Sequence, residues 1–204
     1  MWGLVESGSI TKIINKPKGL VVGDIRYSRK IFELWSKSEL EAIGIYEVEF
    51  DNSNKKDEQW YINTNQTFTY DADAGTVTAT YGDATAKAHA DTLFTAQDET
   101  DGLGTEGEVA TRGLKYNLIK TVKAQAAGIL QDTDWYIVRK ADAGTAVPSS
   151  ITNHRAAVRT TAAEMETAIT NASDTPALET LYTYTEQEDG SITRPLGELP
   201  TLES

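Results

Sequence analysis

The hydrophobic pattern of the chain changes near residue 82. Before that point, apolar and polar residues alternate in short runs rich in β-branched and aromatic residues, as in half-buried β-strands. The runs lie at residues 2–6, 9–14, 20–27, 45–50, 60–62, 68–70 and 77–81. Asp73-Ala74-Gly75, between the last two runs, is typical of a hairpin loop. Residues 1–82 are therefore predicted to form a small β-rich N-terminal domain.

One short helix is predicted inside this domain. Ser36 and Glu39 have the spacing of a capping box, in which each side chain bonds to the backbone N–H of the other residue. Gly44 is a suitable C-terminal stop, because glycine adopts the left-handed conformation that ends many helices. Leu40 and Ile43 lie between these signals and form the buried side of the predicted helix.

Two longer segments in the second half have helical spacing. The first carries apolar residues at intervals of four and seven, namely Leu114, Leu118, Val122 and Ile129. The second carries a narrow stripe at alternating steps of four and three, formed by Ile151, Arg155, Val158, Ala162, Met165 and Ile169. Residues 113–181 are therefore predicted to form a helical hairpin in which each helix covers the apolar face of the other.

The connector between these helices holds the adjacent rings of Trp135 and Tyr136. Its glycine and proline content predicts a turn-rich segment. A large aromatic ring at this place has two interpretations. It either closes the open end of the hairpin as a core residue, which we expect of Trp135, or it is an exposed anchor for a partner protein.

The remaining segments have weaker patterns. Residues 83–112 combine an alanine-rich stretch, predicted to be helical from Ala84 to Ala90, with an acidic linker. Thr175-Pro176 is typical of the start of a short helix. Residues 182–204 are predicted to form a hairpin around Asp189-Gly190 or an extended tail. Taken together, the chain is predicted to be an α+β protein.

The net charge of the chain disfavours some classes of binding partner. The formal net charge of −12 disfavours nucleic acid and anionic membrane surfaces, because both are bound through clustered lysine and arginine. The absence of cysteine excludes disulfides and cysteine-based metal sites. The sequence has no run of about 18 apolar residues, so no membrane-spanning helix is predicted. The start MWGLVESGSI has no basic region followed by an apolar run, so we expect no signal peptide.

The candidate chemistry is sparse. His89 and His154 lie in different predicted segments, and no nucleophile motif accompanies either residue. Five carboxylates could attract calcium, but they lack EF-hand spacing, so a solvated loop is expected at Asp98, Glu99, Asp101, Glu106 and Glu108. The glycines at 102, 104 and 107 follow no predicted strand. The chain is therefore predicted not to be an enzyme, with no catalytic residues, no cofactor and no metal.

The residues around the connector are the better candidates for a binding site. Arg155 interrupts an apolar stripe, which favours a specific role such as an ion pair with Asp132 or Asp134. Aromatic and arginine side chains are enriched at protein interfaces. The predicted partner-binding residues are Trp135, Tyr136, Arg139, His154 and Arg155.

Two stretches resemble proteins of tailed bacteriophages. Thr133-Asp134-Trp135, a proline-containing loop and a helix that opens with an aromatic-arginine pair together resemble the C-terminal part of tail fibre assembly proteins and related tail-associated proteins. That pair is commonly Tyr-Arg in the family, whereas this chain has His154-Arg155. Residues 34–45, LWSKSELEAIGI, resemble a short module of many phage tail proteins. The two matches cover Leu34–Ile45 and Thr133–Arg159, roughly a fifth of the chain.

The resemblance implies a virion protein that acts through protein–protein contacts in tail or tail-fibre assembly and is assembled in the host cytoplasm. Phage tail or fibre proteins are the expected partners, and a homo-oligomer, first of all a trimer, is expected because phage fibres are commonly trimeric. A transient assembly chaperone is one alternative. Another is a receptor- or glycan-binding module at the tail tip, in which Trp60, Tyr61 and Tyr70 would stack on sugars.

Overall fold

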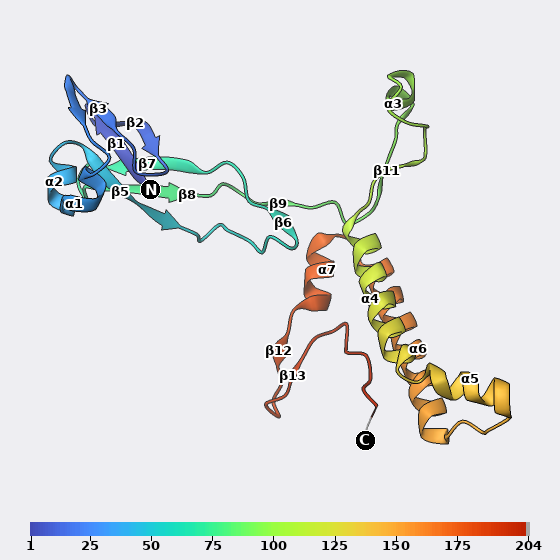
Figure 1. The fold of residues 1–204 in the computed structure, drawn as a ribbon. Helices are drawn as coiled ribbons and strands as arrows, with labels where there is room; N and C mark the ends of the chain where they lie inside the picture. The colour runs from blue at the N-terminus through green and yellow to red at the C-terminus, as the bar shows by residue number, and fades with distance from the viewer. Residues whose placement is uncertain (203–204) are drawn as a thin grey trace. The chain divides into compact units, whose positions relative to one another are not determined.

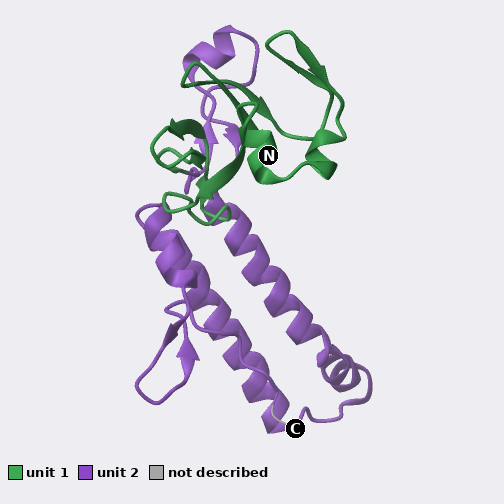
Figure 2. Cartoon of the chain, turned by 90° about the vertical axis from the view of Figure 1, so that its left-hand side faces the viewer, with its two compact units in different colours: residues 1–85 green, residues 86–204 purple. Residues whose placement is uncertain are grey.

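The chain is an α+β protein, as the sequence predicts. A computed structural model describes residues 1–202 and divides the chain into two compact units, Met1–Thr85 and Ala86–Ser204 (Figure 2). Strands predominate in unit 1, and the long helices all belong to unit 2 (Figure 1).

Unit 1 is built on a five-stranded sheet. Its strands are β1 (Trp2–Glu6), β2 (Ser9–Ile14), β5 (Ile45–Asp51), β7 (Thr67–Asp71) and β8 (Thr76–Thr80), in the order β2-β1-β5-β8-β7. Only β5 and β8 pair in parallel. The sheet curves into a half-barrel, so that its edge strands β2 and β7 come into contact.

The two faces of this sheet carry separate cores, because strand side chains alternate between faces. One face packs against the hairpin of β3 (Leu20–Val22) and β4 (Ile25–Tyr27) and against the helices α1 (Ile31–Leu34) and α2 (Lys37–Glu41). Its buried residues are Leu4, Ile14, Leu20, Ile31, Leu40 and Ile45. The inner face is smaller and buries Val48, Val77 and Ala79.

The predicted capping box of α2 is confirmed. The Ser36 backbone N–H donates to the Glu39 carboxylate at 2.8 Å, and the Glu39 N–H donates to the Ser36 hydroxyl at 3.4 Å. Gly44 then turns the chain into β5 with a φ of +81°. A Cβ at this position would collide with the Val5 carbonyl oxygen, so only glycine fits here without strain.

Unit 2 is organised around two long helices, α4 (Leu114–Gln131) and α6 (Ser149–Asn171), which pack against each other. All six members of the predicted α6 stripe are buried, including Arg155. On α4, Val122 and Ala126 are buried. The helix α7 (Thr175–Tyr182) follows, with Asp174 as its cap and Leu178 fully buried. The hairpin of β12 (Thr185–Glu186) and β13 (Ile192–Thr193) surrounds Asp189-Gly190, as predicted.

The prediction of a helix at Ala84–Ala90 is wrong. The segment is extended, with a short strand β9 (Thr85–Ala86) and no helix. The carbonyls of Ala88 and His89 each accept a hydrogen bond at 3.0 Å from the first two residues of α4. These bonds satisfy N–H groups that a helix start would otherwise leave unpaired, and this tertiary role overrides the helix propensity of alanine.

The acidic segment contains more structure than the predicted linker. It holds the helix α3 (Ala96–Thr100), and β10 (Thr92–Leu93) pairs with β11 (Val109–Thr111) at its base. Thr95 and Asp98 form a second capping box, which explains why so polar a segment starts a helix.

The remaining strand is the short β6 (Tyr61–Ile62) of unit 1.

Candidate functional site

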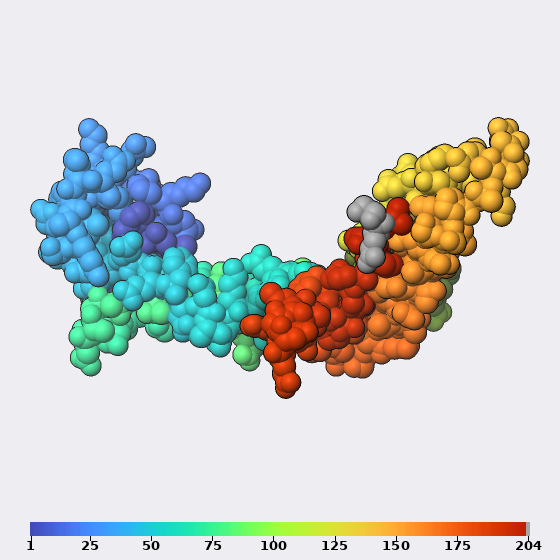
Figure 3. Space-filling model, turned by 90° about the horizontal axis from the view of Figure 1, so that it is seen from below, coloured from blue at the N-terminus to red at the C-terminus, as the bar shows by residue number. Residues whose placement is uncertain are grey.

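The connector between α4 and α6 contains a helix at residues 134–143, where the prediction of a turn-rich segment is wrong, and an irregular stretch at residues 144–148. Helix α5 (Asp134–Ala143) begins at the end of α4 and ends at Gly144, which has a left-handed φ of +68°. Asp134 lies in its first turn and Lys140 in its last turn, so both charges match the helix dipole. None of its residues is buried, and it projects from the two long helices (Figures 1 and 3).

Arg155 fixes the corner from which α5 projects. Its side chain is buried, and one of its terminal N–H groups donates to the Leu130 carbonyl at 2.6 Å and to the Thr133 hydroxyl at 2.7 Å. The other terminal nitrogen pairs with the Asp134 carboxylate at 2.8 Å. One side chain of α6 thereby connects the last turn of α4 to the first turn of α5. Of the two predicted ion pairs, the structure contains the one with Asp134.

The expectation that Trp135 is a core ring is wrong. Its side chain is 51% exposed, and Val138, one turn further along α5, is 65% exposed. The ring misses the core because α5 leaves the hairpin at the Arg155 corner instead of folding back over its end. Trp135, Val138 and Arg139 share one helix face, since residues three and four apart are neighbours on a helix. We call these three residues the α5 surface.

Arg139 is held by stacking and not by an ion pair. Its guanidinium lies 4.6 Å from the ring centre of Trp135 and 5.3 Å from that of Tyr136, and the two rings are 3.9 Å apart. Its Nε atom is buried and has no hydrogen-bond partner within residues 1–202. Its terminal nitrogens also make no hydrogen bond or ion pair within residues 1–202, so a guanidinium oriented by two rings is suited to bind a carboxylate through them.

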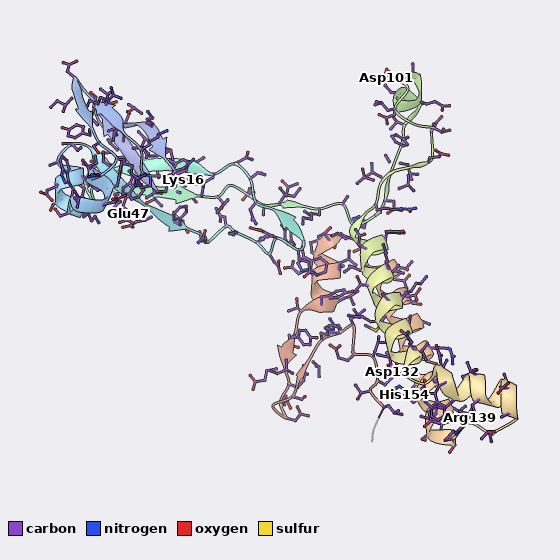
Figure 4. All side chains as sticks on the ribbon, in the orientation of Figure 1. Lys16, Glu47, Asp101, Asp132, Arg139 and His154 are labelled. Atoms are coloured by element: carbon purple, nitrogen blue, oxygen red, sulfur yellow. The ribbon has the colours of Figure 1, made fainter. Side chains whose placement is uncertain are left out.

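The five predicted partner-binding residues meet at this corner, but they differ in exposure. Figure 4 shows Arg139 and His154 at the same end of the long helices. Arg155 and His154 are buried, so they can only position other groups. Trp135 and Arg139 on α5, with the half-buried Tyr136 beside them, can reach another molecule. The other histidine, His89, lies at the opposite end of α4, where its carbonyl accepts from Lys115.

The aromatic residues considered for sugar binding belong to unit 1 and are buried or partly buried. Trp60 and Tyr61 are 3% and 4% exposed. Tyr70 is partly buried against the inner core, and its hydroxyl donates to that of Tyr46 at 3.1 Å. Such rings serve packing, and Trp60 and Tyr61 do not form a stacking surface.

The acidic segment does not bring its carboxylates together. Asp98 is used in the capping box, and Glu99 accepts from the backbone N–H of Glu106 at 3.2 Å. Within residues 1–202, no group of three or more potential ligand side chains is placed to hold a metal ion.

A groove of about 490 Å³ was missed by the sequence reasoning. Its walls come from α4, α6 and the C-terminal segment, and it is lined by Gln125, Gly128, Ile129, Asp132, Met165, Arg194, Glu198 and Leu199. Arg194 is fixed there by a 3.0 Å bond to Glu198 and by the rings of Tyr182 and Tyr184, each with its centre 5.2 Å away. No sequence signal relates the three segments that supply these residues, because the segments are far apart along the chain and share no motif.

No known protein family, no curated protein and no solved structure matches this chain. Among residues 1–202, no helix is both long enough and apolar enough to cross a membrane.

Proposed function

We propose that this protein is a non-enzymatic component of a bacteriophage tail or tail fibre, which works through protein–protein contacts in assembly. The observation that carries the proposal is the α5 surface, a rigidly positioned set of aromatic, aliphatic and arginine side chains that the rest of unit 2 leaves uncovered. This surface lies within Thr133–Arg159, the longer of the two stretches that resemble phage tail proteins.

The geometry of α5 supports a role in binding. Trp135 and Val138 expose apolar area, and Arg139 adds a cation beside the Trp135 ring. Tryptophan, tyrosine and arginine carry most of the binding energy in many protein interfaces. Because the buried Arg155 fixes the start of α5, little conformational freedom has to be lost when a partner binds.

The two alternative functions, a glycan-binding module and an assembly chaperone, agree with the exposed surfaces of the structure to different degrees. A receptor- or glycan-binding module would need exposed rings, whereas Trp60 and Tyr61 are buried. A transient assembly chaperone would use the same α5 surface and differs only in leaving the finished particle.

Mass spectrometry of purified particles tests the proposal. The protein should be present at a fixed ratio to the tail proteins after density-gradient purification. Its presence in infected cells together with its absence from particles would favour the chaperone, and turnover of a glycan or peptide substrate by the purified chain would contradict both.

A further inference from the structure

We infer that the α5 surface binds the acidic end of α3 from a second copy of this chain, in a head-to-tail contact. This inference rests on the proposed function, because it names the occupant of the same surface. The occupant is the segment around Asp101, Leu103 and Glu106, which we call the acidic tip.

The α5 surface lacks a counter-ion. Arg139 stacks on two rings, has a buried Nε without a hydrogen-bond partner and makes no ion pair within residues 1–202. Lys140, next to it, is exposed and also makes no ion pair there. A ligand that fits must bring a carboxylate for the guanidinium and an apolar group for Trp135 and Val138.

The acidic tip has this composition. Asp101 and Glu106 are exposed, and between them Leu103 is a large apolar side chain with 64% exposure. Asp101 accepts one bond from Gln97, which leaves most of its carboxylate lone pairs unused, and the Glu106 carboxylate has no partner within residues 1–202. No lysine or arginine occurs from residue 98 to residue 108.

The tip is also held in shape before any contact. The Phe94 N–H donates to the Glu108 carbonyl at 2.9 Å, and the Gly107 N–H donates to the Phe94 carbonyl at 3.0 Å. The capping box of Thr95 and Asp98 fixes the start of α3. Both sides of the contact are therefore preorganised, which limits the entropy lost on association.

The two surfaces of one chain cannot meet each other. The acidic tip precedes α4 and α5 follows it, so the 18 residues of α4, a length of about 27 Å, separate them. Figure 4 shows Asp101 and Arg139 at opposite ends of this helix. Their complementary charges can therefore pair only between copies, and a contact of this kind joins copies into a closed ring or an open chain.

Sedimentation velocity of the full chain over a range of concentrations tests the inference. The wild-type chain should self-associate, and the association should weaken as salt screens the charges. Arg139→Glu should weaken association at least tenfold, and so should the tip variant Asp101→Lys/Glu106→Lys. Combining the three changes reverses both surfaces and should restore association. Lys120→Glu, which makes the same change of charge as Arg139→Glu on an exposed position of α4, is the matched control and should have no effect.

Three results would overturn the inference. They are a wild-type chain that stays monomeric, an association that Arg139→Glu leaves unchanged, and a triple variant that fails to recover, which would assign α5 another occupant. Circular dichroism confirms that each variant folds, as expected for substitutions at residues that are not buried. Incorporation into particles is scored separately. If the protein is monomeric but is still found in particles, the acidic tip does not bind the α5 surface, whereas the proposed function as a tail component is unaffected.

Discussion

Replacing Arg155 with methionine should destabilise unit 2 by about 3–6 kcal/mol, the sum expected for two hydrogen bonds from a charged group. Methionine keeps the apolar stem but removes the donors to the Leu130 carbonyl and the Thr133 hydroxyl. Hydrogen bonds from a charged group contribute about 1.5–3 kcal/mol each. The ion pair with Asp134 adds at most about 1 kcal/mol, because the Asp134 side chain is 55% exposed and the pair is screened by water.

Urea denaturation followed by the helical circular dichroism signal measures this loss, because α4 and α6 contribute most of the helix in the chain. Arg159→Met is the matched control. Arg159 lies one turn further along α6 and is exposed, and within residues 1–202 its side chain donates only to the Arg155 carbonyl, at 3.3 Å. Its replacement should change the free energy of unfolding by no more than about 0.5 kcal/mol. Equal losses for the two variants would refute the conclusion that Arg155 fixes the corner.

Three further substitutions test other parts of the structure. Trp135→Ala should lower the free energy of unfolding by about 1–2 kcal/mol, the sum expected for an exposed cation–π contact and a ring pair, and a loss of about 3–5 kcal/mol would show that the ring is a core residue after all. The Gly113 N–H, and after it the Arg112 guanidinium, lower the pKa of Asp91. The Asp91 carboxylate therefore stabilises the folded chain above pH of about 4 and loses this effect as the pH falls. Asp91→Asn should flatten the acid limb of a pH–stability curve, and an unchanged limb would exclude this role. Gly44→Ala should destabilise unit 1 by about 1–3 kcal/mol more than Gly75→Ala, measured by urea denaturation. Both glycines have positive φ, but only at Gly44 would the added Cβ meet backbone, so equal losses would contradict the close approach to Val5.

The sequence predicts those elements whose pattern reports burial. The α6 stripe is recognisable because the helix packs along one face, so that its period survives even where Arg155 interrupts it. The capping box of Ser36 and Glu39 is recognisable because its hydrogen bonds are local. Both features can be read without knowing what lies elsewhere in the chain.

Other elements leave no such pattern. Helix α5 has no buried face, and its 10 residues are too few to show a repeated apolar stripe, so the remaining local signals are an acidic residue in its first turn and Gly144 at its end. The alanine-rich segment is extended because Ala88 and His89 accept bonds from α4, a tertiary effect that propensity does not contain. The corner that Arg155 forms between α4 and α5 contains one feature of each kind. Its ion pair could be predicted, whereas the exposure of Trp135 depends on the direction in which α5 leaves α4.

Site-specific photo-crosslinking in cells that produce the particles tests most directly whether α5 contacts another protein chain. A photoreactive residue is placed at Val138, which is 65% exposed on the α5 surface. A control is placed at Glu164, which is exposed on α6. If α5 is the contact surface of a tail protein, illumination should join position 138 to another protein chain and leave position 164 without adducts. The absence of adducts from position 138, or equal adducts from both positions, would contradict this role for α5.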